Sequence, residues 1–287
     1  MGSTKEAEIE AGEAPKGRKR LPAPGSAAPS SPQQRQWVGF AFLAFVLATA
    51  GANSPALQIS DRVREADDHY LGRQDLDNLT KGLELLRAEV AQDPDSYEAW
   101  WRISKFVHYQ ARHSAGSAKA KLIDEGVGAG KHAVALEPNR VEGHFWLGAN
   151  YELASESRGF FGFLRGLLLV DSIRKEMETV NRLDPDYEMG GGLRTLARLD
   201  YRAPFFMGGD KKRSIERLKK CLEHHPDDSL AMLYLSDSDM ALGHRDEARQ
   251  ELELILKLCP DPQYGPELAE NQEEARARVA KSSHPSK

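Results

Sequence analysis

Cysteine is scarce in this sequence. The 287 residues include only Cys221 and Cys259, which are too few for a disulfide framework and too isolated for a zinc site. Each lies near the end of a predicted helix, where we expect a plain buried thiol. A bridge between the two in an oxidising compartment is the alternative, which depends on a separation that the sequence does not give.

An excess of positive charge is also lacking. The formal net charge is −5, so we expect no nucleic-acid binding, which a strongly basic face typically marks. Catalytic motifs are missing as well: the sequence has no His-Glu-x-x-His, phosphate-binding loop, Gly-x-Ser-x-Gly or Cys-x-x-Cys. The pair His224-His225 is interpreted as a solvated helix end, where histidine favours the negative end of the dipole. We therefore predict a non-enzymatic protein with no catalytic residue, cofactor or metal site.

The N-terminal region lacks apolar periodicity. Residues 1–36 are rich in Ala, Pro, Gly, Ser and charge, a composition typical of disorder. Residues 37–53 contain an apolar run that is shorter than the roughly 20 residues of a comfortable membrane span. Two interpretations stay open, a cleaved secretory signal peptide and an uncleaved signal-anchor. Under both, the body of the chain is expected in the periplasm, and residues 282–287 are expected to form a disordered tail.

Strand signals are few after residue 57, and helical periodicity dominates. Leu79, Leu83 and Leu86 begin one apolar stripe at helical spacing. Short turns at residues 72–75, 208–210 and 243–246 each combine a glycine, which is able to end one helix, with an aspartate, which is able to cap the next.

Five prolines close the predicted helical stretches, because proline cannot continue a helix and moves the preceding residue out of the α region. They are Pro94, Pro138, Pro185, Pro226 and Pro260. The last two are 34 residues apart, which is the period of a tetratricopeptide repeat, and the other intervals are longer. The pattern predicts an array of helical hairpins with insertions.

Residue types recur in phase with these prolines. The last repeat has Met232 and Leu235-Ser236 on its first helix, followed by Ala248, Leu252 and Ile255 on its second. After Pro94, the small positions are Gly126, Gly130 and Ala133. These residues resemble the tetratricopeptide repeat, over most of residues 57–260. The resemblance implies an all-α solenoid of four to five helical hairpins over residues 57–281, with a C-terminal capping helix near Pro266–Lys281.

A narrower resemblance comes from the segment Pro204-Phe205-Phe206-Met207-Gly208-Gly209-Asp210. It is similar to the Pro-x-x-x-Gly-Gly-Asp element that joins two helices in the T-components of tripartite (TRAP) transporters, the TatT-like proteins. This resemblance implies a protein-binding scaffold whose partner is a TRAP-type solute-binding protein, and which forms oligomers. Animal regulators of microtubule dynamics are a weaker comparison.

Clustered aromatic residues are the candidates for partner or ligand binding, since exposed apolar patches mark binding surfaces. They are Trp101, Phe145, Trp146, Phe160, Phe161, Phe163, Phe205 and Phe206. The competing interpretation is that they fill the core at helical spacing. Two other functions stay open: a carrier that binds a small hydrophobic ligand in a pocket lined by some of the same residues, and an envelope assembly factor.

Overall fold

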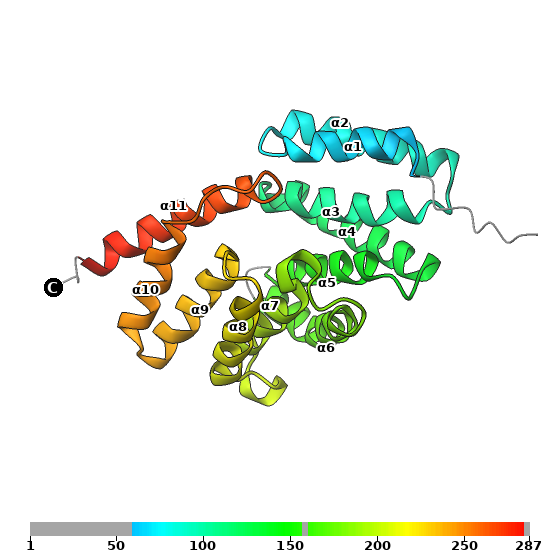
Figure 1. Cartoon of the computed structure of the whole chain (residues 1–287). Helices are drawn as coiled ribbons and strands as arrows, with labels where there is room; N and C mark the ends of the chain where they lie inside the picture. The colour runs from blue at the N-terminus through cyan, green and yellow to red at the C-terminus, as the bar shows by residue number, and fades with distance from the viewer. Residues whose placement is uncertain (1–58, 157–159, 284–287) are drawn as a thin grey trace, which may run out of the picture. The chain divides into compact units, whose positions relative to one another are not determined.

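The computed structural model describes residues 59–156 and 160–283, without the side chains of residues 160–165, 282 and 283. This part of the chain is all helical, with no strand in it (Figure 1). Its helices are α1 (Asp61–Leu71), α2 (Leu76–Gln92), α3 (Tyr97–Arg112), α4 (Gly116–Leu136), α5 (Val141–Ser155), α6 (Phe160–Leu183), α7 (Tyr187–Arg202), the 3-10 helix η1 (Phe205–Met207), α8 (Lys211–His224), α9 (Ser229–Leu242), α10 (Arg245–Ile255) and α11 (Gly265–Ser283).

Several predictions concern residues beyond this part. The predicted segments 1–36 and 37–53 lie outside the described residues, as does the end of the predicted tail; α11 itself extends to Ser283. Among the helices of the described residues, none combines the length and the apolar character that crossing a bilayer requires.

The helices pack in consecutive pairs. Hairpins one to five are α1–α2, α3–α4, α5–α6, α7–α8 and α9–α10, and α11 packs against the fifth. The first helices of neighbouring hairpins also contact one another in turn, which places α1, α3, α5, α7 and α9 in one inner row. This arrangement confirms the predicted all-α solenoid, with five hairpins and a C-terminal helix in the described part of the chain.

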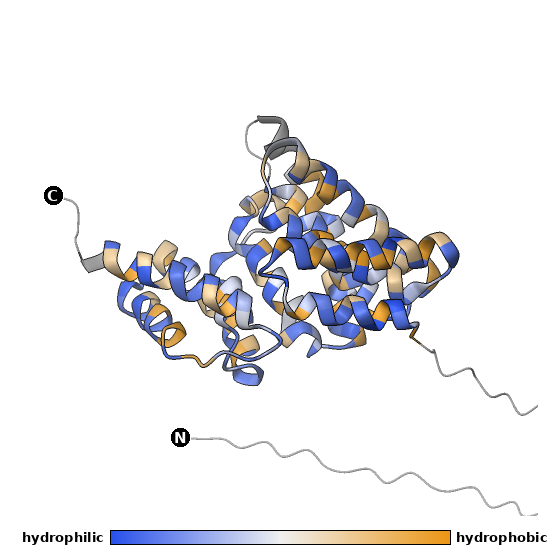
Figure 2. Ribbon diagram, turned by 90° about the horizontal axis from the view of Figure 1, so that it is seen from above, coloured by the Kyte–Doolittle hydropathy of each residue, from blue (hydrophilic) through white to orange (hydrophobic). Residues whose placement is uncertain are grey.

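The predicted helix ends and apolar stripes are confirmed. The second helix of every hairpin ends two to five residues before one of the five prolines, as at Leu136 before Pro138. Leu79, Leu83 and Leu86 are fully buried in the core of the first two hairpins. Figure 2 shows hydrophobic and hydrophilic residues on each helix, as expected of amphipathic helices that bury one side.

Two of the three predicted aspartate caps form. The Asp75 carboxylate accepts a hydrogen bond from Asp77 N (3.0 Å), and that of Asp210 accepts from Lys212 N (2.9 Å). The third prediction is wrong: Asp246 lies within the first turn of α10, and His244 precedes that helix. Gly243, with a left-handed φ of 88°, follows α9 directly and α10 begins at Arg245, so the next helix starts two residues too early for Asp246 to be its cap.

The cysteines differ from each other. Cys221 is buried, as predicted, whereas Cys259 is exposed, and both are free thiols. The prediction of a buried Cys259 is wrong because α10 ends at Ile255, so this residue lies in the connection to α11 instead of on a helix that packs against the core.

Close helix packing explains the small residues of α4 and gives a direct test. A Cβ at Gly130 would lie 2.9 Å from Leu147 Cα of α5, whereas a Cβ at Gly128, on the same helix, would meet nothing within 4 Å. We expect Gly130→Ala to lower the free energy of unfolding by about 1–3 kcal/mol, because backbone must move. Gly128→Ala is expected to raise it by about 0.5–1 kcal/mol through helix propensity.

Urea denaturation followed by circular dichroism measures both glycine variants. A Gly130→Ala protein as stable as the Gly128→Ala protein would contradict the close approach of α4 and α5 at Leu147.

Candidate functional site

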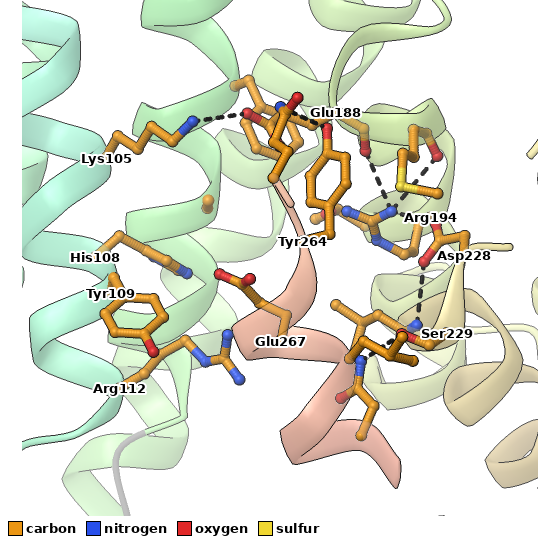
Figure 3. Close-up of a pocket in the computed structure, with 18 of the residues that line it drawn as sticks. Lys105, His108, Tyr109, Arg112, Glu188, Arg194, Asp228, Ser229, Tyr264 and Glu267 are labelled. Carbon is orange, nitrogen blue, oxygen red and sulfur yellow. Dashed lines mark hydrogen bonds and ion pairs between the residues drawn. The ribbon is translucent and has the colours of Figure 1, made fainter. Parts of the chain in front are cut away.

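A cavity of about 600 Å³ lies inside the solenoid, and we call it the inner groove. Its walls come from α3, α5, α7 and α9 of the inner row, and the segment from Cys259 to Asn271 covers one side (Figure 3). This volume falls within the range of protein sites that bind ligands or short segments of chain.

Helix α5 supplies an aromatic wall of the groove. Phe145 and Trp146 are both almost fully buried, with ring centroids 5.0 Å apart in an edge-to-face arrangement. The Trp146 indole N–H donates to the Tyr187 hydroxyl (3.1 Å), which orients the ring. Helix α5 is buried on nearly all sides because it is packed between α4, α6 and the groove.

Charged side chains of both signs surround this aromatic wall. Lys105 Nζ lies 3.2 Å from a carboxylate oxygen of Glu188 and 5.2 Å from the centroid of the Trp146 ring. Across the groove, Arg194 of α7 pairs with Asp228, the N-cap of α9. These charges are largely buried and are paired within the protein.

Two titratable groups in the groove have shifted pKa values. Burial, assisted by the nearby Glu156 carboxylate, raises the pKa of Glu152 to about 7. Burial lowers the pKa of His108 to about 3, and the positive charges of Arg112 and Lys119 act in the same direction. Near neutral pH, His108 is therefore uncharged and Glu152 is partly protonated.

A left-handed turn forms the rim beside Lys105. Glu188, Met189 and Gly190 have φ values of 50°, 57° and 70°, and the first two lack the freedom of glycine, which costs about 1–3 kcal/mol at each residue. Arg194 donates to the carbonyl oxygens of Glu188 (3.3 Å) and Met189 (3.5 Å), which holds the turn. The turn aims the Glu188 carboxylate at Lys105.

The structure separates the eight residues predicted from the sequence. Phe145 and Trp146 line the inner groove. Trp101 is half-buried against the apolar cluster that contains Phe145 and Trp146, but it does not line the groove. The Arg102 guanidinium lies 4.1 Å from its ring centroid. Phe160, Phe161 and Phe163 begin α6, and their side chains lie outside the described residues.

The last two predicted residues, Phe205 and Phe206, form a second, separate feature that we call the aromatic tip. They are 92% and 74% exposed on η1. The turn that presents them needs both glycines: Gly208 has a φ of 82°, and a Cβ at Gly209 would lie 1.9 Å from Ala203 O. The Pro-x-x-x-Gly-Gly-Asp element is therefore a rigid turn that ends in the cap of α8.

The charged residues of the groove, chiefly Arg73, Lys105, Arg194 and Glu267, were not predicted from the sequence. They come from four different helices or turns and follow no motif. The one available signal was a charged residue among apolar residues that face inward on the same helix, as with Lys105, which lies between Ile103 and Phe106. Within the described residues, no group of three or more His, Cys, Asp or Glu side chains is placed to hold a metal ion.

Comparisons with known proteins place this geometry in a class. The family model "Tetratricopeptide repeat" matches residues 207–265, which include α8, α9 and α10. Among solved structures, the chain is similar to TTC0263, a thermophilic TPR protein in Thermus thermophilus, with 17% sequence identity, a TM-score of 0.53 and coverage of 76% of this chain and 97% of that chain. It is also similar to MamA, with 14% identity, a TM-score of 0.44 and coverage of 77% and 98%. No curated protein sequence matches significantly.

The chain thus carries a tetratricopeptide repeat and has the fold of a tetratricopeptide-repeat solenoid. This is the class of helical-repeat scaffold, in which stacked hairpins build an extended inner surface suited to binding other proteins.

Proposed function

We propose that this protein is a non-enzymatic scaffold that binds a segment of a protein partner in its inner groove. The observation that carries the proposal is the composition of the groove: an aromatic wall, Phe145 and Trp146, next to desolvated charges such as Lys105 and Glu188. Buried aromatic anchors beside paired charges are the usual high-energy elements of protein interfaces.

A small-ligand carrier is the second candidate, and the cavity volume supports it. About 600 Å³ suits a ligand of moderate size. The charged walls, however, match a peptide with its own polar backbone and side chains better than a hydrophobic ligand. Native mass spectrometry of the purified protein separates the two, because only a carrier retains a bound small molecule.

For the identity of the partner, we propose the solute-binding protein of a TRAP-type transporter, with the body of the scaffold in the periplasm. The support is the resemblance of residues 204–210 to the T-component element, together with the rigid turn that those residues form. The same resemblance is the reason for proposing that the scaffold forms oligomers.

Charge reversal in the groove tests the binding proposal. We expect Lys105→Glu to weaken partner binding about tenfold or more, because it places a second negative charge beside Glu188. Affinity purification from the host, followed by quantitative mass spectrometry, measures the loss of each protein that co-purifies with the unmodified chain.

Two further variants serve as controls for Lys105→Glu. Lys121→Glu makes the same charge change at an exposed position of α4 and is expected to retain the partner. The double variant Phe205→Asp/Phe206→Asp alters only the aromatic tip. If the tip variant loses the partner while Lys105→Glu keeps it, binding belongs to the tip and the groove proposal is wrong.

A further inference from the structure

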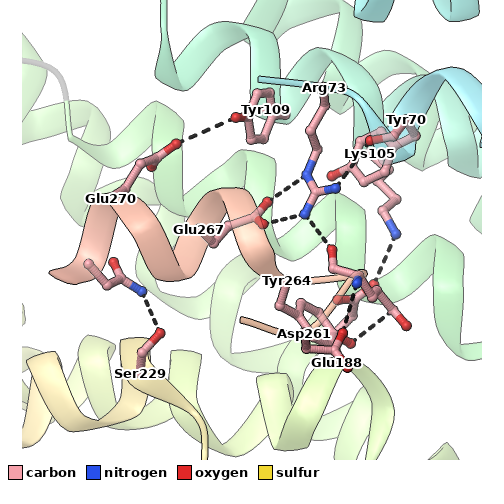
Figure 4. A network of polar contacts seen from close by, with 12 residues as sticks. Tyr70, Arg73, Lys105, Tyr109, Glu188, Ser229, Asp261, Tyr264, Glu267 and Glu270 are labelled. Carbon is pink, nitrogen blue, oxygen red and sulfur yellow. Dashed lines mark hydrogen bonds and ion pairs between the residues drawn. The ribbon is translucent and has the colours of Figure 1, made fainter. Parts of the chain in front are cut away.

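The connection from α10 to α11 crosses the inner groove. We call residues 259–271 the C-terminal strap. Its start follows the fifth hairpin, yet the beginning of α11 lies beside α3 (Figure 1), and side chains of the strap contact residues of the first and second hairpins (Figure 4). The strap therefore links the two ends of the solenoid across the open side of the groove.

The first contact of the strap is the Glu267 carboxylate on Arg73. Arg73 Nε donates to Glu267 Oε1 (2.8 Å), and Nη2 bonds the other carboxylate oxygen and the carbonyl oxygen of Gln263 (2.5 Å). The Arg73 side chain is only 1% exposed, with Tyr70 and Tyr109 rings 4.6 and 5.6 Å away. A guanidinium this buried requires an anion beside it.

The second contact is the Glu270 carboxylate, which three groups at the end of α3 hold. Arg112 Nη2 lies 3.0 Å from one oxygen, while His113 Nε2 (2.9 Å) and the Tyr109 hydroxyl (3.5 Å) approach the other. Glu267 and Glu270 are three residues apart on one helix, so both carboxylates point from the same face. Four side chains thus surround two carboxylates one helical turn apart. We call these four the acid receptor: Arg73, Tyr109, Arg112 and His113.

Within the strap, Leu268 is the one buried apolar side chain, and the Asn271 amide donates to the Ser229 hydroxyl (2.9 Å). The apolar anchor of α11 lies further along, where Ala275 and Val279 pack against the fifth hairpin. In the strap, Glu267 and Glu270 are 25% and 34% exposed. Ion pairs that are partly open to water contribute little stability, so the Glu267 and Glu270 carboxylates are able to leave the acid receptor while Ala275 and Val279 keep α11 on the fifth hairpin.

We propose that the acid receptor binds an acidic helical segment of the protein partner, with two carboxylates one turn apart, and that Glu267 and Glu270 occupy it as an internal ligand until the partner displaces them. This inference rests on the proposed function and adds the chemistry of the partner to it. A neutral or basic segment would leave the buried Arg73 charge without an anion, whereas a segment that repeats the strap's own carboxylates restores every contact.

A peptide copied from the chain tests the proposal. The probe is a fluorescein-labelled peptide of residues 261–274, and its control has Gln in place of both Glu267 and Glu270. The full chain is compared with its Glu267→Gln/Glu270→Gln variant, which keeps the side-chain shape but weakens the internal ligand. The matched control is Glu247→Gln/Glu273→Gln, which removes the same charge at exposed positions.

We expect the Glu267→Gln/Glu270→Gln variant to bind the acidic peptide about tenfold or more tightly than the unmodified chain, because more of the protein has an open receptor. The Glu247→Gln/Glu273→Gln control should bind like the unmodified chain, and the Gln peptide should bind about tenfold more weakly. Combining Arg112→Gln with Glu267→Gln/Glu270→Gln should remove most of the increase in affinity for the acidic peptide. No gain over the control, or equal binding of the two peptides, overturns the proposal.

Hydrogen exchange on the unmodified protein gives an independent measurement. A saturating concentration of the acidic peptide should increase exchange of the backbone amides of residues 266–271, because the strap leaves its site. Unchanged exchange under saturation overturns displacement. If exchange does not increase while Lys105→Glu loses the partner, the internal-ligand proposal is wrong and the proposed function stands. If Lys105→Glu retains the partner, the proposed function is wrong whatever the exchange result.

Discussion

Replacing Phe106 with alanine is expected to lower the free energy of unfolding by about 3–5 kcal/mol. The Phe106 ring is fully buried between the first two hairpins, with its centroid 4.7 Å from that of the Tyr70 ring. Helix α2 packs directly on it, since a Cβ at Gly82 would lie 2.6 Å from the ring edge. Truncation leaves a cavity that these closely packed helices cannot fill. Urea denaturation followed by the helical circular dichroism signal measures the loss.

Phe206→Ala is the matched control for Phe106→Ala, because it makes the same change at the exposed aromatic tip. We expect it to alter the free energy of unfolding by no more than about 0.5 kcal/mol. Since repeats contact mainly their neighbours, Phe106→Ala should also increase hydrogen exchange in α1–α4 more than in α7–α10. Equal losses for the two phenylalanines would show that the first is not part of the core.

The second large effect is expected at Asp200, whose carboxylate is fully buried at the end of α7. Arg213 binds both of its oxygens, at 2.6 and 2.9 Å, and Arg217 Nε lies 3.3 Å away. Asp200→Ala leaves these cations without their common anion, and breaking a buried ion pair in this way costs about 3–5 kcal/mol. Because the arginines are partly exposed and regain some water, we expect a loss of about 3 kcal/mol, at the lower end of that range.

Asp200→Ala should also loosen the aromatic tip. The Asp200 carbonyl accepts from Asp210 N (2.8 Å), and Arg213 also donates to Gly208 O, so the same cluster holds both ends of the turn. Hydrogen exchange of residues 205–210 measures this effect. Asp171→Ala, at an exposed position of α6, is the control and should change stability by no more than about 0.5 kcal/mol. If Asp200→Ala is no less stable than this control, the ion cluster is not a source of stability.

Much of the fold was predictable because its signals are local. A proline excludes itself from a helix through its own ring and missing N–H, whatever surrounds it. Pro138 and Pro226 therefore mark helix ends correctly without any knowledge of packing. The small residues Gly126 and Gly130 were also informative, since a close helix contact is one reason for glycine to stand inside a helix where it costs stability. Local signals misplaced the helix start at one turn, where the cap is His244 instead of Asp246, a shift of two residues.

The candidate site was only partly predictable. Phe145 and Trp146 were predicted as binding residues, and the structure places both on the groove wall; whether they bind a partner stays a prediction. The aromatic tip was predicted from the same kind of signal, yet it lies on η1 and does not line the groove. Hydrophobicity alone does not separate a wall residue from a tip residue, because that depends on which helices lie nearby.

Amino-acid order alone decided that this chain is a row of helical hairpins, since helix periodicity and helix termination act over a few residues. The closing of that row was decided only by its tertiary structure. Arg73 and Glu267 are 194 residues apart. They meet because the small rotations between successive hairpins add up until α11 reaches the turn between α1 and α2. No short segment encodes such a sum, so the charged lining of the groove and its contacts with Glu267 and Glu270 form only when all the hairpins are stacked.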